Sequence, residues 1–110
     1  MDKETEQKIN QLTMIEQSMH QLLSQKQGFQ AQLMEVESAL SELDRTDKAY
    51  RIVGNIMVAA DKKPLKEELG SKQDILNLRI KNIEKQENSL KDKAKSVQTE
   101  VMETIRKEKK

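Results

Sequence analysis

A short apolar segment near the middle of the chain, residues 49–60, reads AYRIVGNIMVAA. It is rich in β-branched residues and carries Gly54-Asn55 at its centre, with an apolar run on each side. This arrangement predicts a β-hairpin, because the tight turns that join paired strands need a residue with positive φ. The expected cross-strand pairs are Val53 with Ile56, Ile52 with Met57, and Tyr50 with Ala59.

The predicted hairpin carries apolar side chains on both of its faces. A lone two-stranded ribbon is marginally stable in water, and this one also has two unpaired strand edges. The segment therefore predicts association with further chains, since a hairpin that merely caps one helix pair would leave both faces wet. The expected assembly residues are Tyr50, Ile52, Val53, Gly54, Ile56, Met57 and Val58.

On the N-terminal side of the hairpin, apolar residues recur in alternating steps of three and four. Such steps average about 3.5 residues, the repeat that winds helices into a left-handed coiled coil. Lys26 takes one position of this seam as a polar member. The apolar members are Leu12, Ile15, Met19, Leu22, Phe29, Leu33, Val36, Leu40 and Leu43.

The C-terminal side predicts a second helix with a weaker seam. Pro64 suits the first turn of this helix, where its missing N–H costs little, and Asp61 could cap its start. Gln73 and Glu87 interrupt the seam. Its apolar members are Leu69, Leu76, Ile80, Ile83, Leu90, Ala94, Val97 and Val101.

Because the hairpin reverses the chain, we expect the two helices to pack antiparallel. A register centred on the turn pairs residues whose numbers sum to 109, which puts Lys26 and Glu87 in adjacent layers where they can pair. Residues 1–50 hold five basic and nine acidic side chains, and residues 51–110 hold 15 and 10, so the halves have opposite net charge. The expected domain is mainly α, with a coiled-coil helix over 1–47, a hairpin assembly element over 48–61 and a coiled-coil helix over 62–110.

The composition excludes several classes of protein. The 110 residues include no Cys, so there is no disulfide or thiolate metal site, and His20 is the single histidine. The longest apolar run, residues 56–60, is far shorter than the roughly 20 residues that span a bilayer. The N-terminus lacks the apolar stretch of a signal peptide, so we expect a soluble, cytoplasmic protein. Only 2% of residues are aromatic and no Gly-rich phosphate loop is present, so we expect no enzyme, no cofactor, no metal and no nucleic-acid partner.

Residues 50–58, YRIVGNIMV, carry the pattern Tyr-x-x-Val-Gly-x-Ile-x-Val between two coiled-coil segments. This resembles the β-type subunit of prefoldin, most closely the archaeal form, over nearly the whole chain. The specific part is the hairpin with the Lys- and Glu-rich segment that follows it, because heptads alone are common. The roughly 17 residues between Leu43 and Asp61 hold one hairpin of the usual strand length, whereas an α-type subunit has two hairpins.

The resemblance implies an ATP-independent holdase, a hexamer of two α-type and four β-type subunits. In that family the hairpins form a double β-barrel, the tips of the coiled coils grip unfolded proteins, and a group II chaperonin receives them. Clients would then contact the terminal ends of the two helices. The expected client-binding residues are Ile9, Leu12, Met14, Ile15, Met19, Val97, Val101, Met102 and Ile105.

Two alternatives remain open on the sequence. For the seam members Leu12, Ile15, Val97 and Val101, closing the helix pair is the favoured explanation, although fraying of the helix ends would let them serve both roles. The off-seam members should be partly exposed, and for them client contact is favoured. The whole chain could also be a coiled-coil scaffold or tether without chaperone activity. The basic run over residues 105–110 could meet an acidic chaperonin surface or be a solvated end.

Overall fold

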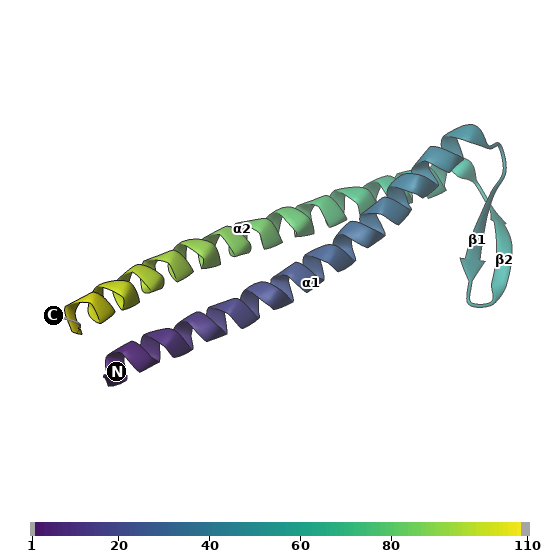
Figure 1. Ribbon diagram of the computed structural model, residues 1–110. Coiled ribbons are helices and arrows are strands. Elements are labelled where there is room, and N and C mark those ends of the chain that lie inside the picture. The colour runs from purple at the N-terminus through teal and green to yellow at the C-terminus, as the bar shows by residue number, and fades with distance from the viewer. Residues whose placement is uncertain (1, 109–110) are drawn as a thin grey trace. The chain divides into compact units, whose positions relative to one another are not determined.

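The computed structural model describes residues 2–108, which form two long helices joined by a two-stranded hairpin (Figure 1). Helix α1 spans Lys3–Arg45 and helix α2 spans Lys62–Glu108. Strand β1 spans Ala49–Val53 and strand β2 spans Ile56–Ala60. The predicted mainly α fold with a central hairpin is confirmed. Residues 1, 109 and 110 of the predicted helical parts lie outside the described residues.

Local hydrogen bonds explain where the helices begin. Asp2 precedes α1, and its Oδ1 accepts a 2.8 Å hydrogen bond from the Thr5 backbone N–H, which is the usual N-cap arrangement. Hydrogen bonding by Thr5 holds the pKa of the Asp2 carboxyl below its ordinary value. At the start of α2, the carbonyl of Asp61 accepts the N–H of Leu65 at 3.3 Å. Pro64 lies in the first turn of this helix, as predicted.

The hairpin has the register predicted from the sequence. Strands β1 and β2 pair antiparallel, with Val53 opposite Ile56, Ile52 opposite Met57 and Tyr50 opposite Ala59. Gly54 has a φ of +62°, and Asn55 has negative φ. Positive φ at the first central residue is the pattern of a type II′ turn, whose twist matches that of the flanking strands.

Two compact units make up the described chain, and each contains part of both helices. The terminal unit consists of residues 2–26 and 82–108, and the hairpin unit consists of residues 27–81. Side chains that meet across the helices are Lys8 with Glu100 and Lys26 with Glu87 in the terminal unit, and Phe29 with Arg79 and Asp44 with Lys66 in the hairpin unit. In each pair the two residue numbers add up to within four of 109. Within each unit, therefore, the helices run antiparallel near the predicted register.

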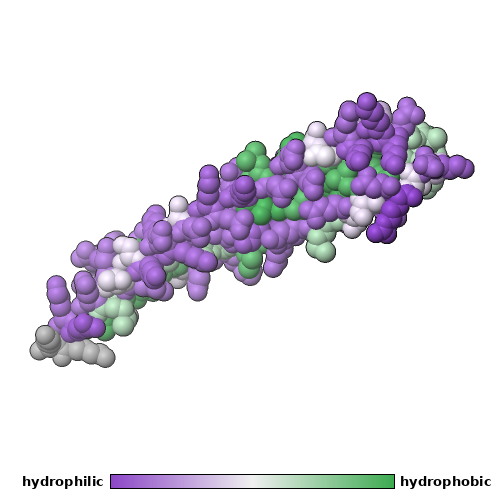
Figure 2. Space-filling view, turned by 90° about the horizontal axis from the view of Figure 1, so that it is seen from above, coloured by the Kyte–Doolittle hydropathy of each residue, from purple (hydrophilic) through white to green (hydrophobic). Residues whose placement is uncertain are grey.

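The predicted heptad seam forms the core of both units. Every seam position is buried or half-buried, and on the face shown in Figure 2 hydrophilic side chains cover most of the surface. The seam also continues toward the N-terminus beyond its predicted start at Leu12. Thr5 lies seven residues before Leu12, and the side chain of Thr5 is fully buried. The deeply buried apolar members are Ile15, Val36, Leu43, Leu76, Ile80, Ile83, Val97 and Val101.

We expect Leu76→Ala to lower the free energy of unfolding by about 2–5 kcal/mol, because Leu76 is 2% exposed and its loss leaves a cavity in the seam. The matched control is Leu78→Ala, two residues away on α2 and 60% exposed. Its effect should stay within about 0.5 kcal/mol. Urea unfolding followed by circular dichroism measures both, and equal effects would contradict the assignment of the seam.

Candidate functional site

The hairpin presents two different faces. Side chains alternate across a strand, and residues directly opposite each other share a face. The tyrosine face consists of Tyr50, Ile52, Met57 and Ala59. The arginine face consists of Ala49, Arg51, Val53, Ile56, Val58 and Ala60.

Both faces leave large apolar side chains in water. Ile52 and Met57 on the tyrosine face are 69% and 63% exposed, and Tyr50 beside them is 55% exposed. Val53, Ile56 and Val58 are also exposed on the arginine face. Within residues 2–108, β1 and β2 pair only with each other, so each strand has an unpaired outer edge. Exposed apolar side chains on a strand pair with open edges are typical of a surface that another chain covers.

Only the base of the hairpin packs closely on the rest of the hairpin unit. Ala49 is buried and Ala60 is half-buried, both on the arginine face. Farther along this face, the Arg51 guanidinium donates two hydrogen bonds to the Glu68 carboxylate of α2, one from Nη1 to Oε1 at 3.3 Å and one from Nη2 to Oε2. This bidentate hydrogen bonding raises the pKa of Arg51 and lowers the pKa of Glu68.

The terminal unit carries the predicted client-binding residues, and they divide by exposure. Met14 and Met102 are 67% and 62% exposed and extend into solvent, in agreement with their off-seam positions. Four more are half-buried, so part of each side chain reaches the surface: Ile9, Leu12, Met19 and Ile105. The other three are buried in the seam, where they hold the helices together: Ile15, Val97 and Val101. Client contact by these three would require the helix ends to separate, and it stays a prediction.

A shallow groove of about 270 Å³ runs beside the half-buried residues of the terminal unit. Four apolar side chains and two polar ones of α1 line it, with Ala94 and Gln98 of α2. Its α1 lining consists of Ile9, Leu12, Thr13, Ile15, Glu16 and Met19. The groove therefore offers apolar surface without any opening of the helix pair.

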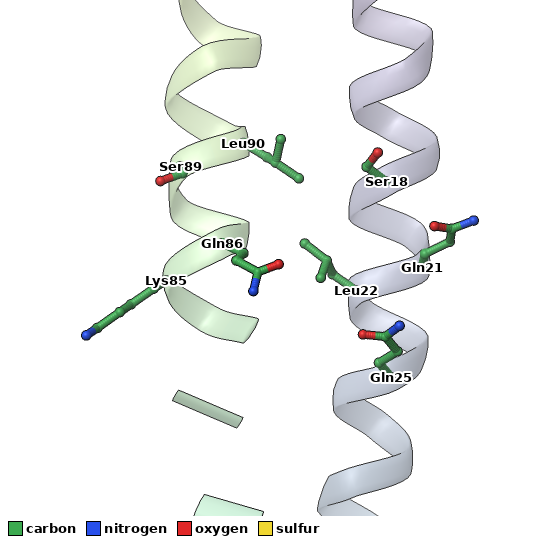
Figure 3. A pocket seen from close by; sticks show the side chains of 8 residues that line it. All are labelled: Ser18, Gln21, Leu22, Gln25, Lys85, Gln86, Ser89 and Leu90. Atoms are coloured by element: carbon green, nitrogen blue, oxygen red, sulfur yellow. The ribbon is translucent and has the colours of Figure 1, made fainter. Parts of the chain in front are cut away.

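A second groove, of about 490 Å³, lies farther along the same unit (Figure 3). Leu22 and Leu90 point toward each other between the helices, and Lys85 extends away from them. The rest of the lining consists of the uncharged polar residues Ser18, Gln21, Gln25, Gln86 and Ser89. This groove joins apolar surface to hydrogen-bonding groups and was not predicted from the sequence.

The polar layer predicted in the seam is present. Lys26 Nζ lies 2.8 Å from Glu87 Oε1, and both side chains are mostly buried. Hydrogen bonding to Glu87 raises the pKa of Lys26 above its ordinary value of 10.5. The contribution of Lys26 to stability is therefore complete below pH 10.5 and is lost as the pH rises through the raised folded-state value.

The family model for the prefoldin subunit matches residues 6–108, nearly the whole chain. The chain belongs to the prefoldin subunit family. It is 33% identical to prefoldin subunit beta of Sulfurisphaera tokodaii over 99 residues, covering 87% of this chain and 79% of that protein. It is also 33% identical to prefoldin subunit beta of Methanospirillum hungatei, covering 88% and 83%.

A solved structure agrees with these relatives. The crystal structure of the prefoldin beta subunit from Thermococcus strain KS-1 matches with a TM-score of 0.89 and 28% identity, covering 96% of this chain and 95% of that one. The resemblance to the β-type subunit of archaeal prefoldin, predicted from residues 50–58, is therefore confirmed. The prefoldin family is one of chaperone subunits, and the relatives carry no enzyme names.

Several features of this prefoldin chain were missed from the sequence. Lys8 Nζ lies 3.1 Å from Glu100 Oε2, and Lys66 Nζ lies 2.8 Å from Asp44 Oδ1. Both pairs lie within one residue of the register in which paired residue numbers sum to 109, so that register was sufficient to predict them. It could not have found Arg51 with Glu68, which depart from that register.

The structure also shows the surroundings of His20 and of the basic run at the end of α2. His20 is exposed, and so are Arg106 and Lys107 of the basic run, whereas Lys109 and Lys110 lie outside the described residues. No group of three or more His, Asp or Glu side chains within residues 2–108 could hold a metal ion. Over the same residues, neither helix has an apolar stretch that could cross a membrane.

We expect Lys26→Met to lower the urea midpoint of the terminal unit, because it leaves the Glu87 carboxylate unpaired in the seam. The double variant Lys26→Met/Glu87→Met should regain the original midpoint or exceed it, since an apolar layer replaces a partly desolvated ion pair. A double variant less stable than either single one would contradict this account of the layer.

Proposed function

We propose that this chain is a β-type subunit of a prefoldin hexamer of two α-type and four β-type subunits. The observation that carries the proposal is the hairpin, which exposes apolar side chains on both faces and leaves both strand edges open. Hairpins of neighbouring subunits would cover these faces and pair these edges in a β-barrel. Burial of apolar side chains, at about 25 cal/mol per Å², would supply the driving force.

We further propose that the assembled protein holds unfolded proteins without ATP, at the terminal ends of its helices. Met14 and Met102 support this, because methionine side chains are flexible and adapt to many apolar shapes. The half-buried Ile9, Leu12 and Met19 beside the first groove add apolar surface. Each end would bind weakly, and several ends on one assembly would bind a client together through high effective concentration.

Transfer of the client to a group II chaperonin in the cytoplasm completes the proposal. It rests mainly on membership of the family. The exposed cations Arg106 and Lys107 offer a surface for an acidic partner. The partners proposed are therefore the α-type subunit, unfolded clients and the chaperonin.

Dilution of a chemically denatured client into buffer that contains this chain and its α-type subunit tests the proposal. We expect light scattering from client aggregates to be suppressed in the absence of ATP, and native mass spectrometry to find a hexamer. A coiled-coil scaffold or tether has no reason to suppress aggregation. Undiminished scattering with an intact hexamer would therefore favour that alternative, and the absence of any assembly would overturn the proposal.

A further inference from the structure

The ion pair between Arg51 and Glu68 fixes how the hairpin lies against its own helix. Arg51 is opposite Val58, two residues before Ala60, and Glu68 comes eight residues after Ala60. If the hairpin continued in line with α2, the two residues would lie about 19 Å apart, at about 3.4 Å per strand residue and about 1.5 Å per helical residue. Their hydrogen bonds show instead that the chain bends between β2 and α2, and the strands of the hairpin run crosswise to this helix (Figure 1).

Few other features could hold the hairpin in this orientation. It joins the helices through short connections, residues 46–48 and Asp61, and only Ala49 is buried at its base. The larger side chains of both strands are exposed and give no packing that would fix an angle. The bidentate pair is directional, because two parallel hydrogen bonds set the plane of the carboxylate against that of the guanidinium.

The pair also distinguishes the two faces of the hairpin. Arg51 lies on the arginine face, so the pair holds the base of this face toward α2. Val58, directly opposite Arg51, is the least exposed large apolar side chain of the hairpin at 42%, whereas Val53 and Ile56 nearer the turn remain as exposed as the tyrosine face. The tyrosine face consists only of apolar and aromatic side chains, so it suits a second apolar surface better than a charged one.

We propose that Arg51 and Glu68 are positioning residues that orient the hairpin before assembly and present its tyrosine face to the hairpin of another prefoldin subunit. The inference rests on the proposed function, since it assumes assembly through the hairpins. A surface held in its bound orientation loses less freedom on association, so assembly is faster than from a swinging hairpin. The pair is exposed, and dissolved salt screens it.

Two measurements on the full-length chain test the inference, with Arg51→Gln, Glu68→Gln and the exchanged pair Arg51→Glu/Glu68→Arg. The first is the distance between nitroxide labels on Asn55→Cys and Ser71→Cys, which is practical because the chain has no cysteine. In the dilute isolated chain we expect one narrow distribution, broader in both single variants and narrow again in the exchanged pair. The second is the rate of assembly with the α-type subunit, followed by light scattering.

We expect both single variants to assemble about threefold or more slowly at low salt, and the exchanged pair to recover most of the rate. Lys66→Gln is the matched control. This substitution removes the ion pair between Lys66 and Asp44, which is about as exposed as the pair between Arg51 and Glu68 but joins the two helices to each other. The Lys66→Gln variant should assemble at the rate of the original chain.

Unchanged distance distributions and unchanged rates in the single variants would overturn the inference. So would broadened distributions with unchanged rates, because the pair would then orient the hairpin without aiding assembly. The distance measurement needs no partner, so it separates a failure of this inference from a failure of the proposed function. The latter shows as a lack of assembly in the original chain.

Discussion

Replacing Ile52 and Val58 by aspartate is expected to abolish assembly while leaving the helices intact. The two residues lie on opposite faces of the hairpin, so the variant places a carboxylate in each surface that a neighbouring subunit would cover. Burying an unpaired charge costs on the order of several kcal/mol, more than an interface of short hairpins can offset. Native mass spectrometry with the α-type subunit should find only unassembled chains, and circular dichroism should find unchanged helix content.

The matched control for this variant is Met34→Asp. Met34 on α1 is 69% exposed, as Ile52 is, but it lies outside the hairpin. The Met34→Asp variant should form the same assembly as the original chain. If the Ile52→Asp/Val58→Asp variant still formed hexamers, the hairpin could not be the assembly surface, and the account of its exposed apolar residues would be wrong.

Removing residues 1–19 and 97–110 is expected to abolish protection of an unfolded client without preventing assembly. The deletion takes away both exposed methionines, Met14 and Met102, and the lining of the first groove except Ala94. The hairpin unit, residues 27–81, keeps its own buried seam, so the surface proposed for assembly is retained. Light scattering from an aggregating client measures the loss, and native mass spectrometry checks for the hexamer.

Point substitutions in the full-length chain separate client contact from helix stability. Met14→Ser/Met102→Ser removes exposed apolar side chains and should weaken protection severalfold while changing the free energy of unfolding by about 0.5 kcal/mol or less per site. Met34→Ser, equally exposed but in the hairpin unit, should protect clients as the original chain does. Equal protection by the truncated chain would show that clients bind elsewhere, and the second groove would be the next surface to test.

The sequence predicted the contacts that follow from periodicity. Once Gly54-Asn55 was placed at the turn, the cross-strand pairs followed, and the same centre of symmetry brought Lys26 near Glu87. The buried Thr5 was not predicted because threonine is polar, whereas the predicted seam consists of apolar residues from Leu12 onward and Lys26. Thr5 lies one heptad before Leu12, so the heptad repeat alone places it in the seam.

The exposure of the predicted client-binding residues was only partly predictable. Met14 and Met102 are as exposed as their off-seam positions imply. Ile9 and Ile105 are off the seam as well, yet both are half-buried. Heptad position gives the direction of a side chain from the helix axis, and the neighbours decide how much of it stays in water.

The repeats of 3.5 and two residues are enough to predict two antiparallel coiled-coil helices around a hairpin too apolar to stay uncovered, because both repeats are local properties of the chain. Which hairpin face turns toward α2 is seen only in the folded chain. That choice depends on Arg51 meeting Glu68 across a bend in the chain. Two short connections allow many angles for such a bend, and no spacing along the sequence encodes the one that forms.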